Sequence, residues 1–214
     1  MSRIGQVLAS PGHALSVGMA LARGHWTRLW CRVRGVRFTA GKGLRVFGKL
    51  SIRGPGQVIF GDNVGVWETV TPWTYDRDAV ITVGDNVMLG GTKFGCKKEI
   101  TIGKDTIIAT ASLTDTDFHS IKADRRQPGA AVRVAPIVIA ENVWIGQFAG
   151  ILPGTRIGQN SVVSFGAICM REYPANVVIV GNPAKVAMPL PGSGDPAPVP
   201  APTARPSEPL SATP

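Results

Sequence analysis

The sequence predicts an all-β fold, a parallel solenoid whose short strands turn a corner every six residues. Between residues 137 and 170 an aliphatic or soft apolar side chain returns at every sixth position. That period matches neither the roughly 3.6 residues of a helical turn nor the alternation of a half-buried strand. Three six-residue units would make one triangular coil, and equivalent residues of successive coils would stack in the core. The repeating row is Ile139, Ile145, Ile151, Ile157, Val163 and Cys169.

A second row of small or β-branched side chains stands two places before each member of the first. Such side chains fit the crowded corners of a coil, and nearby glycines supply φ values that other residues resist. In a chain that is 44% hydrophobic one apolar row can arise by chance, but the matched second row favours the solenoid. We expect Ile139 to stack on Ile157 and Ile145 on Val163. The second row is Ile137, Val143, Ala149, Thr155, Ser161 and Ala167.

A less regular form of the pattern begins near Leu44. The step from Val66 to Val83 is one residue short of three hexads, which predicts an irregular turn at Pro72–Asp78. A one-residue slip follows near Gly95–Glu99. The expected core positions here are Phe60, Val66, Val83, Leu89, Ile102, Ile108 and Thr114.

Two segments break the pattern. Residues 115–135 contain charges, a proline and a glycine but no hexad. We expect a loop extruded from the solenoid, and function usually lies in such loops. Residues 189–214 hold nine prolines among Ser, Ala and Thr, a composition that predicts a disordered tail. The solenoid domain is therefore expected to span residues 44–188.

The N-terminal segment, residues 1–43, dominates the charge of the protein. Residues 1–53 hold ten Lys and Arg and no Asp or Glu, so the formal net charge of +9 belongs to this end of the chain. No zinc-finger, helix-turn-helix or RNA-binding motif accompanies the charge, and we expect no nucleic-acid partner.

A helix is expected over residues 13–34, although Gly18 and Gly24 weaken that prediction. Two compatible roles fit it. The segment covers the open first coil, as every solenoid requires, or it lies on an anionic membrane, as basic stretches with interleaved tryptophans do. Its apolar residues at helical spacing are Trp26, Leu29, Trp30 and Val33.

The three cysteines, Cys31, Cys96 and Cys169, lack metal-ligand spacing. Cys169 falls in the apolar row and is interpreted as a small core hydrophobe. We expect no metal and a reducing, cytoplasmic location, at the inner face of the membrane if the basic segment binds lipid. No stretch approaches the roughly 20 continuous apolar residues needed to span a bilayer.

Three motifs carry a family resemblance. They are NVWIG at Asn142–Gly146, ILPG at Ile151–Gly154 and VGNPAK at Val180–Lys185. Together with the hexads, they resemble the hexapeptide-repeat acyltransferases over about Leu44–Val186, and most of all the acetyl-CoA-dependent sugar O-acetyltransferases. The resemblance implies a left-handed parallel β-helix, a homotrimer with active sites between subunits, and acetyl-CoA as co-substrate without a metal.

The resemblance also places a catalytic histidine where the coil gives way to the loop, at His119. An imidazole there would act as general base, taking the proton from an acceptor hydroxyl as its oxygen attacks the thioester. Asp115 and Asp117 would orient that imidazole or the sugar, although loop aspartates commonly cap turns. Trp67 and Trp73, with Tyr75 nearby, would form an apolar platform for a sugar ring or pack between subunits.

For the acyl donor, the resemblance points to the groove beside the regular coils. Gln147 would lie near the thioester, and Phe165 would offer a main-chain contact to the pantetheine arm. Arg171 and Lys185 would meet the phosphates of CoA, although Arg171 replaces a lysine that is more frequent in the family. Trp144 is expected to face outward because Ile145 faces inward.

The expected function is transfer of acetyl from acetyl-CoA to a hydroxyl of a sugar or surface-polysaccharide precursor. An amino acceptor, a larger acyl group, or a non-catalytic scaffold at the membrane surface are the alternatives. A zinc-dependent β-helix carbonic anhydrase is disfavoured, because His13 and His25 lie in the basic N-terminal segment.

Overall fold

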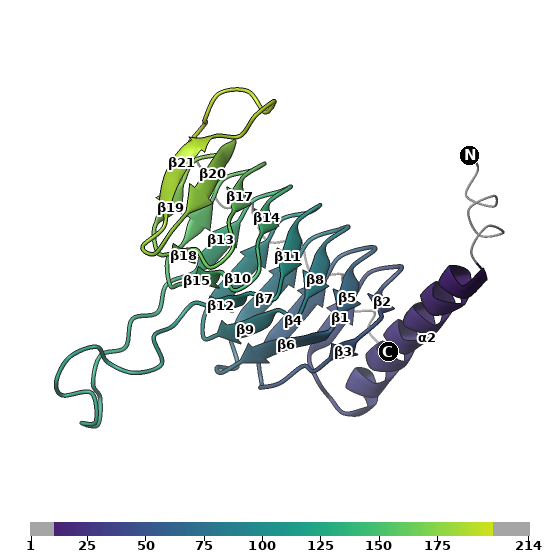
Figure 1. The fold of residues 1–214 in the computed structure, drawn as a ribbon. Helices are drawn as coiled ribbons and strands as arrows, with labels where there is room; N and C mark the ends of the chain where they lie inside the picture. The colour runs from purple at the N-terminus through teal and green to yellow at the C-terminus, as the bar shows by residue number, and fades with distance from the viewer. Residues whose placement is uncertain (1–10, 199–214) are drawn as a thin grey trace.

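The computed structural model is a parallel β-helix built of three sheets, with one helix across its N-terminal end (Figure 1). It describes residues 11–198. From β1 to β20 the chain visits the three sheets in turn, so each strand pairs with the strand three places along the sequence. The predicted all-β solenoid and the N-terminal helix are confirmed.

The bounds of the strands follow the coils. The first sheet contains β1 (Phe38–Ala40), β4 (Gln57–Phe60), β7 (Val80–Val83), β10 (Glu99–Ile102), β13 (Ile137–Ile139), β16 (Arg156–Ile157) and β19 (Glu172–Tyr173). The second contains β2 (Arg45–Val46), β5 (Gly65–Trp67), β8 (Met88–Gly90), β11 (Ile107–Ala109), β14 (Trp144–Ile145), β17 (Val162–Val163), β20 (Val177–Val180) and the antiparallel β21 (Lys185–Pro189). The third contains β3 (Lys49–Leu50), β6 (Thr69–Thr74), β9 (Lys93–Cys96), β12 (Ser112–Thr114), β15 (Gly150–Ile151) and β18 (Ile168–Cys169).

The core consists of the two rows that the sequence predicts. Ile139 is in register with Ile157, and Ile145 with Val163. All members of both rows are buried. The polar members of the corner row are satisfied: Thr155 Oγ1 donates to the carbonyl of Cys169 at 2.9 Å, and Ser161 Oγ donates to that of Pro174 at 3.1 Å. These bonds remove the cost of burying two hydroxyls.

Two details of the earlier coils differ from the expectation. Leu113, not Thr114, fills the core position of β12, because the corner before it is one residue shorter than a full hexad. The expected irregular turn at Pro72–Asp78 begins later, since β6 continues to Thr74. Pro72 cannot donate to the sheet, but its carbonyl accepts a hydrogen bond from the N–H of Arg53 at 2.9 Å.

Helix α2 (Pro11–Val33) lies across the first coil, next to β1 and β2 (Figure 1). Gly24 is the contact point: a Cβ there would lie 2.1 Å from the carbonyl oxygen of Leu44. The glycine that weakens the helix in sequence is therefore what allows it to dock closely. Among the described residues, no helix is long and apolar enough to cross a membrane.

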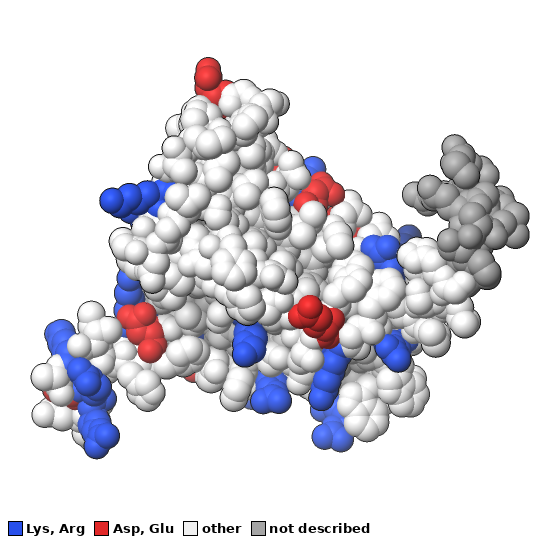
Figure 2. All heavy atoms as spheres, in the orientation of Figure 1, with Lys and Arg blue, Asp and Glu red and all other residues white. Residues whose placement is uncertain are grey.

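The extruded loop leaves after β12 and returns to β13 without interrupting the wall. β10 pairs with β13 and β12 with β15, as if the loop were absent. An antiparallel bridge between Thr116 and Val134 closes the base of the loop. Figure 2 shows Lys and Arg side chains on this loop and along the same edge of the solenoid toward α2.

At the other end, residues 190–198 run against the last coil. Asn176 Nδ2 donates to the carbonyl of Asp195 at 2.8 Å, and the N–H of Ala175 donates to that of Ala197 at 2.7 Å. Contacts of the tail thus extend to Ala197. The rest of the segment expected to be disordered, residues 199–214, lies outside the described residues.

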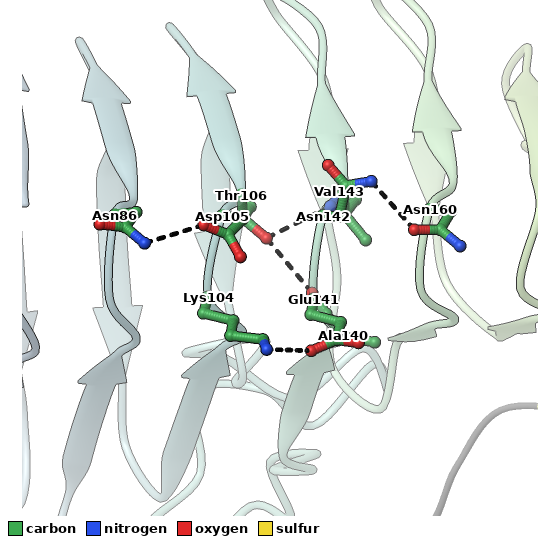
Figure 3. Close-up of polar contacts among 9 residues, drawn as sticks. All are labelled: Asn86, Lys104, Asp105, Thr106, Ala140, Glu141, Asn142, Val143 and Asn160. Carbon is green, nitrogen blue, oxygen red and sulfur yellow. Dashed lines mark hydrogen bonds and ion pairs between the residues drawn. The ribbon is translucent and has the colours of Figure 1, made fainter.

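One corner of the solenoid carries a column of asparagines (Figure 3). Asn86 Nδ2 donates to Asp105 Oδ1 at 3.0 Å, and Asn142 Nδ2 donates to Asn160 Oδ1 at 2.9 Å. Each member has φ between 54° and 61°, the left-handed region that asparagine tolerates better than most residues. The column is Asn63, Asn86, Asp105, Asn142, Asn160 and Asn176.

Candidate active site

His119 lies at the first turn of the extruded loop. Its N–H donates to the carbonyl of Asp117 at 2.7 Å, and the residue between them, Phe118, has φ of 60°. This is a γ-turn with positive φ, a rare and strained form, and it is occupied here by a bulky aromatic residue. Such strain persists only where the surroundings hold it, and it clusters at functional sites. The His119 side chain is exposed and makes no hydrogen bond to any described residue.

A stack of aromatic rings holds the turn. The ring of Phe118 meets that of Tyr75 edge-on, with centroids 4.7 Å apart, and Tyr75 stacks on Trp73 at 5.0 Å. The guanidinium of Arg53 covers the next face, 5.4 Å from the ring centre of Trp73. Gly95 makes room below, because a Cβ there would lie 2.9 Å from Cζ of Phe118. The stack thus connects the wall of the solenoid to the residue before His119.

Asp115 is buried beneath the loop rather than open to a substrate. Its carboxylate accepts hydrogen bonds from the backbone N–H groups of Lys97, Lys98 and Glu99, each at 2.7 Å. The thiol of Cys96 lies 3.5 Å from the same group. Asp115 therefore braces the neighbouring corner, at the point where the sequence pattern slips by one residue.

Asp117 and the two tryptophans have different surroundings. Asp117 is half-buried, and its N–H donates to the carbonyl of Arg133 across the base of the loop, at 3.1 Å. Trp73 belongs to the stack beside His119. Trp67 lies at another corner, stacked on Phe47 with ring centres 4.9 Å apart. The two tryptophans therefore do not form one platform in a single chain.

A groove of about 460 Å³ runs beside the second sheet and brings together Gln147 and Phe165. Trp144 lines it and is half exposed, as expected from the inward neighbour. Within the part of the chain that the structure describes, the backbone N–H groups of Gln147 and Phe165 have no protein acceptor. An apolar groove of this size with two free donors suits a ligand that has polar groups along a flexible arm.

The two basic residues lie together on the last coils. Arg171 Nη2 donates to the carbonyl of Ala184 at 3.0 Å, so its guanidinium lies beside the turn that carries Lys185. That turn stacks on β18, because the N–H of Ile168 donates to the carbonyl of Gly181 at 3.0 Å. Both side chains are exposed. The pair offers two positive charges on the coil that follows the groove.

The histidine and the groove lie at different corners of the triangular coil. His119 follows a strand of the third sheet, whereas Gln147 and Phe165 follow strands of the second. One chain alone therefore does not bring the predicted base to the predicted donor site. Residues 11–198 contain no group of three or more His, Cys, Asp or Glu side chains able to hold a metal ion.

Sequence reasoning missed Phe118 and Gly95. Their role depends on a positive φ and on a contact between coils, and neither leaves a mark in a hexad pattern. The available signal was a large aromatic residue next to the only histidine of the loop. Ser164, which also lines the groove, gave no signal at all.

The fold and these sites define a class of β-helix transferases, and comparison with known proteins supports that class. The family model described as bacterial transferase hexapeptide (six repeats) matches residues 136–170. The chain is 32% identical over 162 residues to "Putative lipopolysaccharide biosynthesis O-acetyl transferase WbbJ" of Escherichia coli, covering 71% of this chain and 68% of that protein. The chain therefore belongs to the hexapeptide-repeat acetyltransferases.

Two further relatives differ in how much they share. "Putative acetyltransferase YJL218W" of Saccharomyces cerevisiae is 38% identical over 122 residues, which cover 54% of this chain and 59% of that protein. The N-acyltransferase AntD of Bacillus cereus, solved with dTDP and 3-hydroxybutyryl-CoA, superposes with a TM-score of 0.61 at 17% identity. That alignment covers 74% of this chain and 87% of AntD, and it shows a common fold.

Proposed function

We propose that the protein transfers an acetyl group from acetyl-CoA to a hydroxyl of a sugar or of a surface-polysaccharide precursor. The observation that carries the proposal is His119, exposed on a strained turn where the chain leaves the solenoid. The relative WbbJ, named for lipopolysaccharide biosynthesis and O-acetyl transfer, supports the choice of acceptor class.

His119 acts as the general base. Its imidazole takes the proton of the acceptor hydroxyl while the oxygen attacks the thioester carbonyl carbon. The tetrahedral intermediate collapses by breaking the carbon–sulfur bond, and the imidazolium returns its proton to the CoA thiolate. No covalent enzyme intermediate is needed, which agrees with the burial of all three cysteines.

The donor groove supplies binding and charge stabilisation. The free N–H of Gln147 is suited to the developing oxyanion, since a fixed backbone donor needs no reorganisation during the reaction. The free N–H of Phe165 is suited to an amide oxygen of the pantetheine arm. Arg171 and Lys185 meet the CoA phosphates, and the guanidinium of Arg171 is already oriented by the carbonyl of Ala184.

On the acceptor side we assign Asp117 and Trp73. Asp117 lies two residues from His119 and is close enough in sequence to orient the imidazole or a sugar hydroxyl. Trp73 presents its exposed edge beside the same turn, 39% accessible. Asp115 acts indirectly, by holding the corner at Lys97–Glu99. Trp67 is assigned to an interface between subunits or to a second acceptor contact.

The separation of histidine and groove within one chain leads us to propose a homotrimer. In a ring of three copies, His119 of one subunit would face the groove of the next, so each site combines two chains. We place this trimer in the cytoplasm, with the basic N-terminal segment as its contact with the inner face of the membrane.

Replacing the base tests the mechanism. His119→Ala should fold and bind acetyl-CoA as the parent does, because the side chain makes no contact that supports the core. General-base catalysis contributes typically 10²–10⁴-fold. We therefore expect kcat and kcat/KM to fall together by that factor, about 3–5 kcal/mol of transition-state stabilisation. His119→Asn should be nearly as poor. Steady-state kinetics with CoA release as readout measures both.

Lys122→Ala, an exposed change on the same loop, is the matched control and should leave kcat unchanged. A folded His119→Ala protein with a third or more of the parental kcat would contradict the mechanism. If no acceptor, whether hydroxyl or amine, released CoA from the parent protein, the scaffold alternative would replace the enzyme. An amine acceptor preferred over every hydroxyl would move the function to N-acyl transfer, the activity for which AntD is named.

A further inference from the structure

We infer that the outward face of α2 docks on the surface of an anionic lipid membrane. The helix has two apolar faces, and the solenoid uses one of them. Ala20 and Cys31 are 1% and 5% exposed, and Gly24 touches the backbone of Leu44. Arg23 and Arg28 donate to backbone carbonyls of the first coil, and these bonds fix how the helix is turned about its axis.

The other apolar face lies on the side of the helix opposite Gly24, and at one margin Trp26 and Trp30 border a groove whose far wall is residues 50–52 of the first coil. Each member lies three, four or seven residues from another member, the spacing of side chains that form a seam along one side of a helix. At about 100° per residue, this seam is centred about 180° from Gly24. The exposed fractions are Leu15 65%, Met19 50%, Trp26 64%, Leu29 53%, Trp30 50% and Val33 73%. Capping of the first coil does not account for Leu15, Leu29 and Val33, which leave more than half of their surface open to solvent.

The charges beside the seam favour an anionic surface. Arg23 and Arg34 flank it on one side and Arg32 on the other, by the same helical geometry. The guanidinium of Arg34 also lies 5.1 Å from the ring centre of Trp30, and Trp26 stacks on Trp30 with centroids 6.4 Å apart. Tryptophans on an apolar stripe with arginines along its margins are typical of helices that lie in the plane of a membrane interface.

A second copy of the chain fits this face less well. Residues 1–53 contain no Asp or Glu. Two such seams packed together would therefore bring arginines against arginines with no acidic partner from either helix. Phosphate-bearing lipid head groups supply the missing negative charge, and each Lys or Arg near such a surface adds to the attraction. Lipid is thus the occupant that satisfies both the apolar stripe and its charged margins.

The contact would hold the catalytic edge near the membrane. Basic side chains run from α2 along the same edge of the solenoid to the extruded loop (Figure 2). An acceptor carried on a lipid would then diffuse in the plane in which the loop is held. This last point rests on the proposed acetyl transfer, whereas the docking, which gives the proposed membrane contact its surface, rests on the helix alone.

Vesicle flotation of the full chain tests the inference, with vesicles of neutral phosphatidylcholine and vesicles containing about a third phosphatidylglycerol. We expect binding to the anionic vesicles, weakened at least tenfold when salt rises from 0.05 to 0.5 M, since these charges are exposed and screened. Leu29→Ser/Val33→Ser should lose tenfold or more, and Arg32→Gln/Arg34→Gln should abolish the preference for anionic lipid. Quenching of tryptophan fluorescence by brominated lipid should disappear in Trp26→Phe/Trp30→Phe.

The control is Val186→Ser/Met188→Ser, an exposed apolar pair, 44% and 48% accessible, at the other end of the solenoid. It should bind like the parent. No binding, equal binding to neutral vesicles, or an equal loss in the control would overturn the inference. A decrease in oligomeric state in free solution when Leu29 and Val33 are replaced would also overturn the inference, because the face would then bind a second copy of the chain. Acetyl transfer to a soluble sugar should be unchanged in all of these variants, so failure of the docking and failure of the enzymatic proposal are separable.

Discussion

Asp105 is the one acid in a column of asparagines. In the column, each side-chain amide donates to the oxygen of the next residue, and a carboxylate cannot continue that series. Within the described chain no hydrogen bond joins Asp105 to Asn142, and Figure 3 shows the break. The backbones at this step are spaced as elsewhere, since the N–H of Asn142 donates to the carbonyl of Lys104 at 2.9 Å. The gap is therefore chemical and not geometric.

Asp105→Asn should accordingly stabilise the solenoid. It adds one side-chain hydrogen bond worth about 1 kcal/mol net, which corresponds to roughly 2–4 °C in Tm for a domain of this size. Thermal unfolding by circular dichroism measures the shift. Asp124→Asn, which removes the same charge from the exposed loop, should leave Tm unchanged. A lower Tm in Asp105→Asn would mean that the electrostatic attraction between Asp105 and Lys104 stabilises the fold more than the added hydrogen bond to Asn142 does.

The core cysteine makes stability depend on alkaline pH. Burial raises the pKa of the Cys169 thiol from 9.0 to about 11. Between these values the unfolded chain releases the proton and the folded chain keeps it, so stability is full below pH 9 and falls as pH rises toward 11. Tm should therefore fall as pH rises from 8 to 10.5, and Cys169→Val should make that fall less steep. Cys96 and Tyr173, whose pKa values are also raised by burial, account for a remaining slope.

Single residues also mark where sequence reasoning ended. The aliphatic row was readable because each member obeys a fixed spacing. Asp115 was expected to orient the imidazole or the sugar, but its carboxylate accepts hydrogen bonds from three backbone amides of the preceding coil. Trp67 and Trp73 are close in sequence, but Trp67 lies in β5 of the second sheet and Trp73 in β6 of the third. Contacts between coils decide these cases, and no local pattern encodes them.

At the scale of elements, the regular strands were predictable and the exceptions follow from packing. The hexads after residue 137 fixed strand positions to within a residue, because a slip would move every side chain of a strand to the opposite face. The first strand, β1, begins at Phe38, before Leu44, where the hexads were expected to begin. Three residues are too few to show a six-residue repeat, so the sequence pattern did not indicate this strand. The docking of α2 depends on Gly24, which propensity alone counts against a helix.

The contacts of Asp195 and Ala197 with the last coil should give the C-terminal segment a part in stability. Deleting residues 199–214 should leave Tm unchanged. Deleting residues 191–214 should lower it by a few degrees, because Asn176 and Ala175 lose their acceptors on Asp195 and Ala197, at about 1 kcal/mol each. Differential scanning fluorimetry of the two truncations compares them directly. Equal Tm values for both would show that these contacts add no stability.

For the whole molecule, complementation between two inactive chains tests the proposed assembly. His119→Ala lacks the base, and Phe165→Glu places a charge in the donor groove. If each site joins His119 of one subunit to the groove of the next, every trimer that contains both variants regains one intact site, about a third of its sites. Co-expression with two affinity tags isolates the mixed species for assay.

Restored activity needs two chains per site, since every single chain in the mixture carries a defect. Activity no higher than that of the separate variants would place base and donor in one chain, and the trimer would then have no catalytic role. The left-handed sense of the helix stays a prediction of the family resemblance.

The bridge between Thr116 and Val134 has a consequence for how such a protein changes over generations. In the wall of the solenoid, each coil needs a set number of residues, because adding or removing one residue shifts its strands out of register with the neighbouring coils. Between the two ends of this bridge, any number of residues can be inserted or deleted, and the strands beneath stay paired. We therefore expect an insertion or deletion in this loop to leave the pairing of the strands intact while it changes what approaches His119. If the proposed function holds, a change of loop length alone alters the acceptor side of the site and leaves the donor groove unchanged.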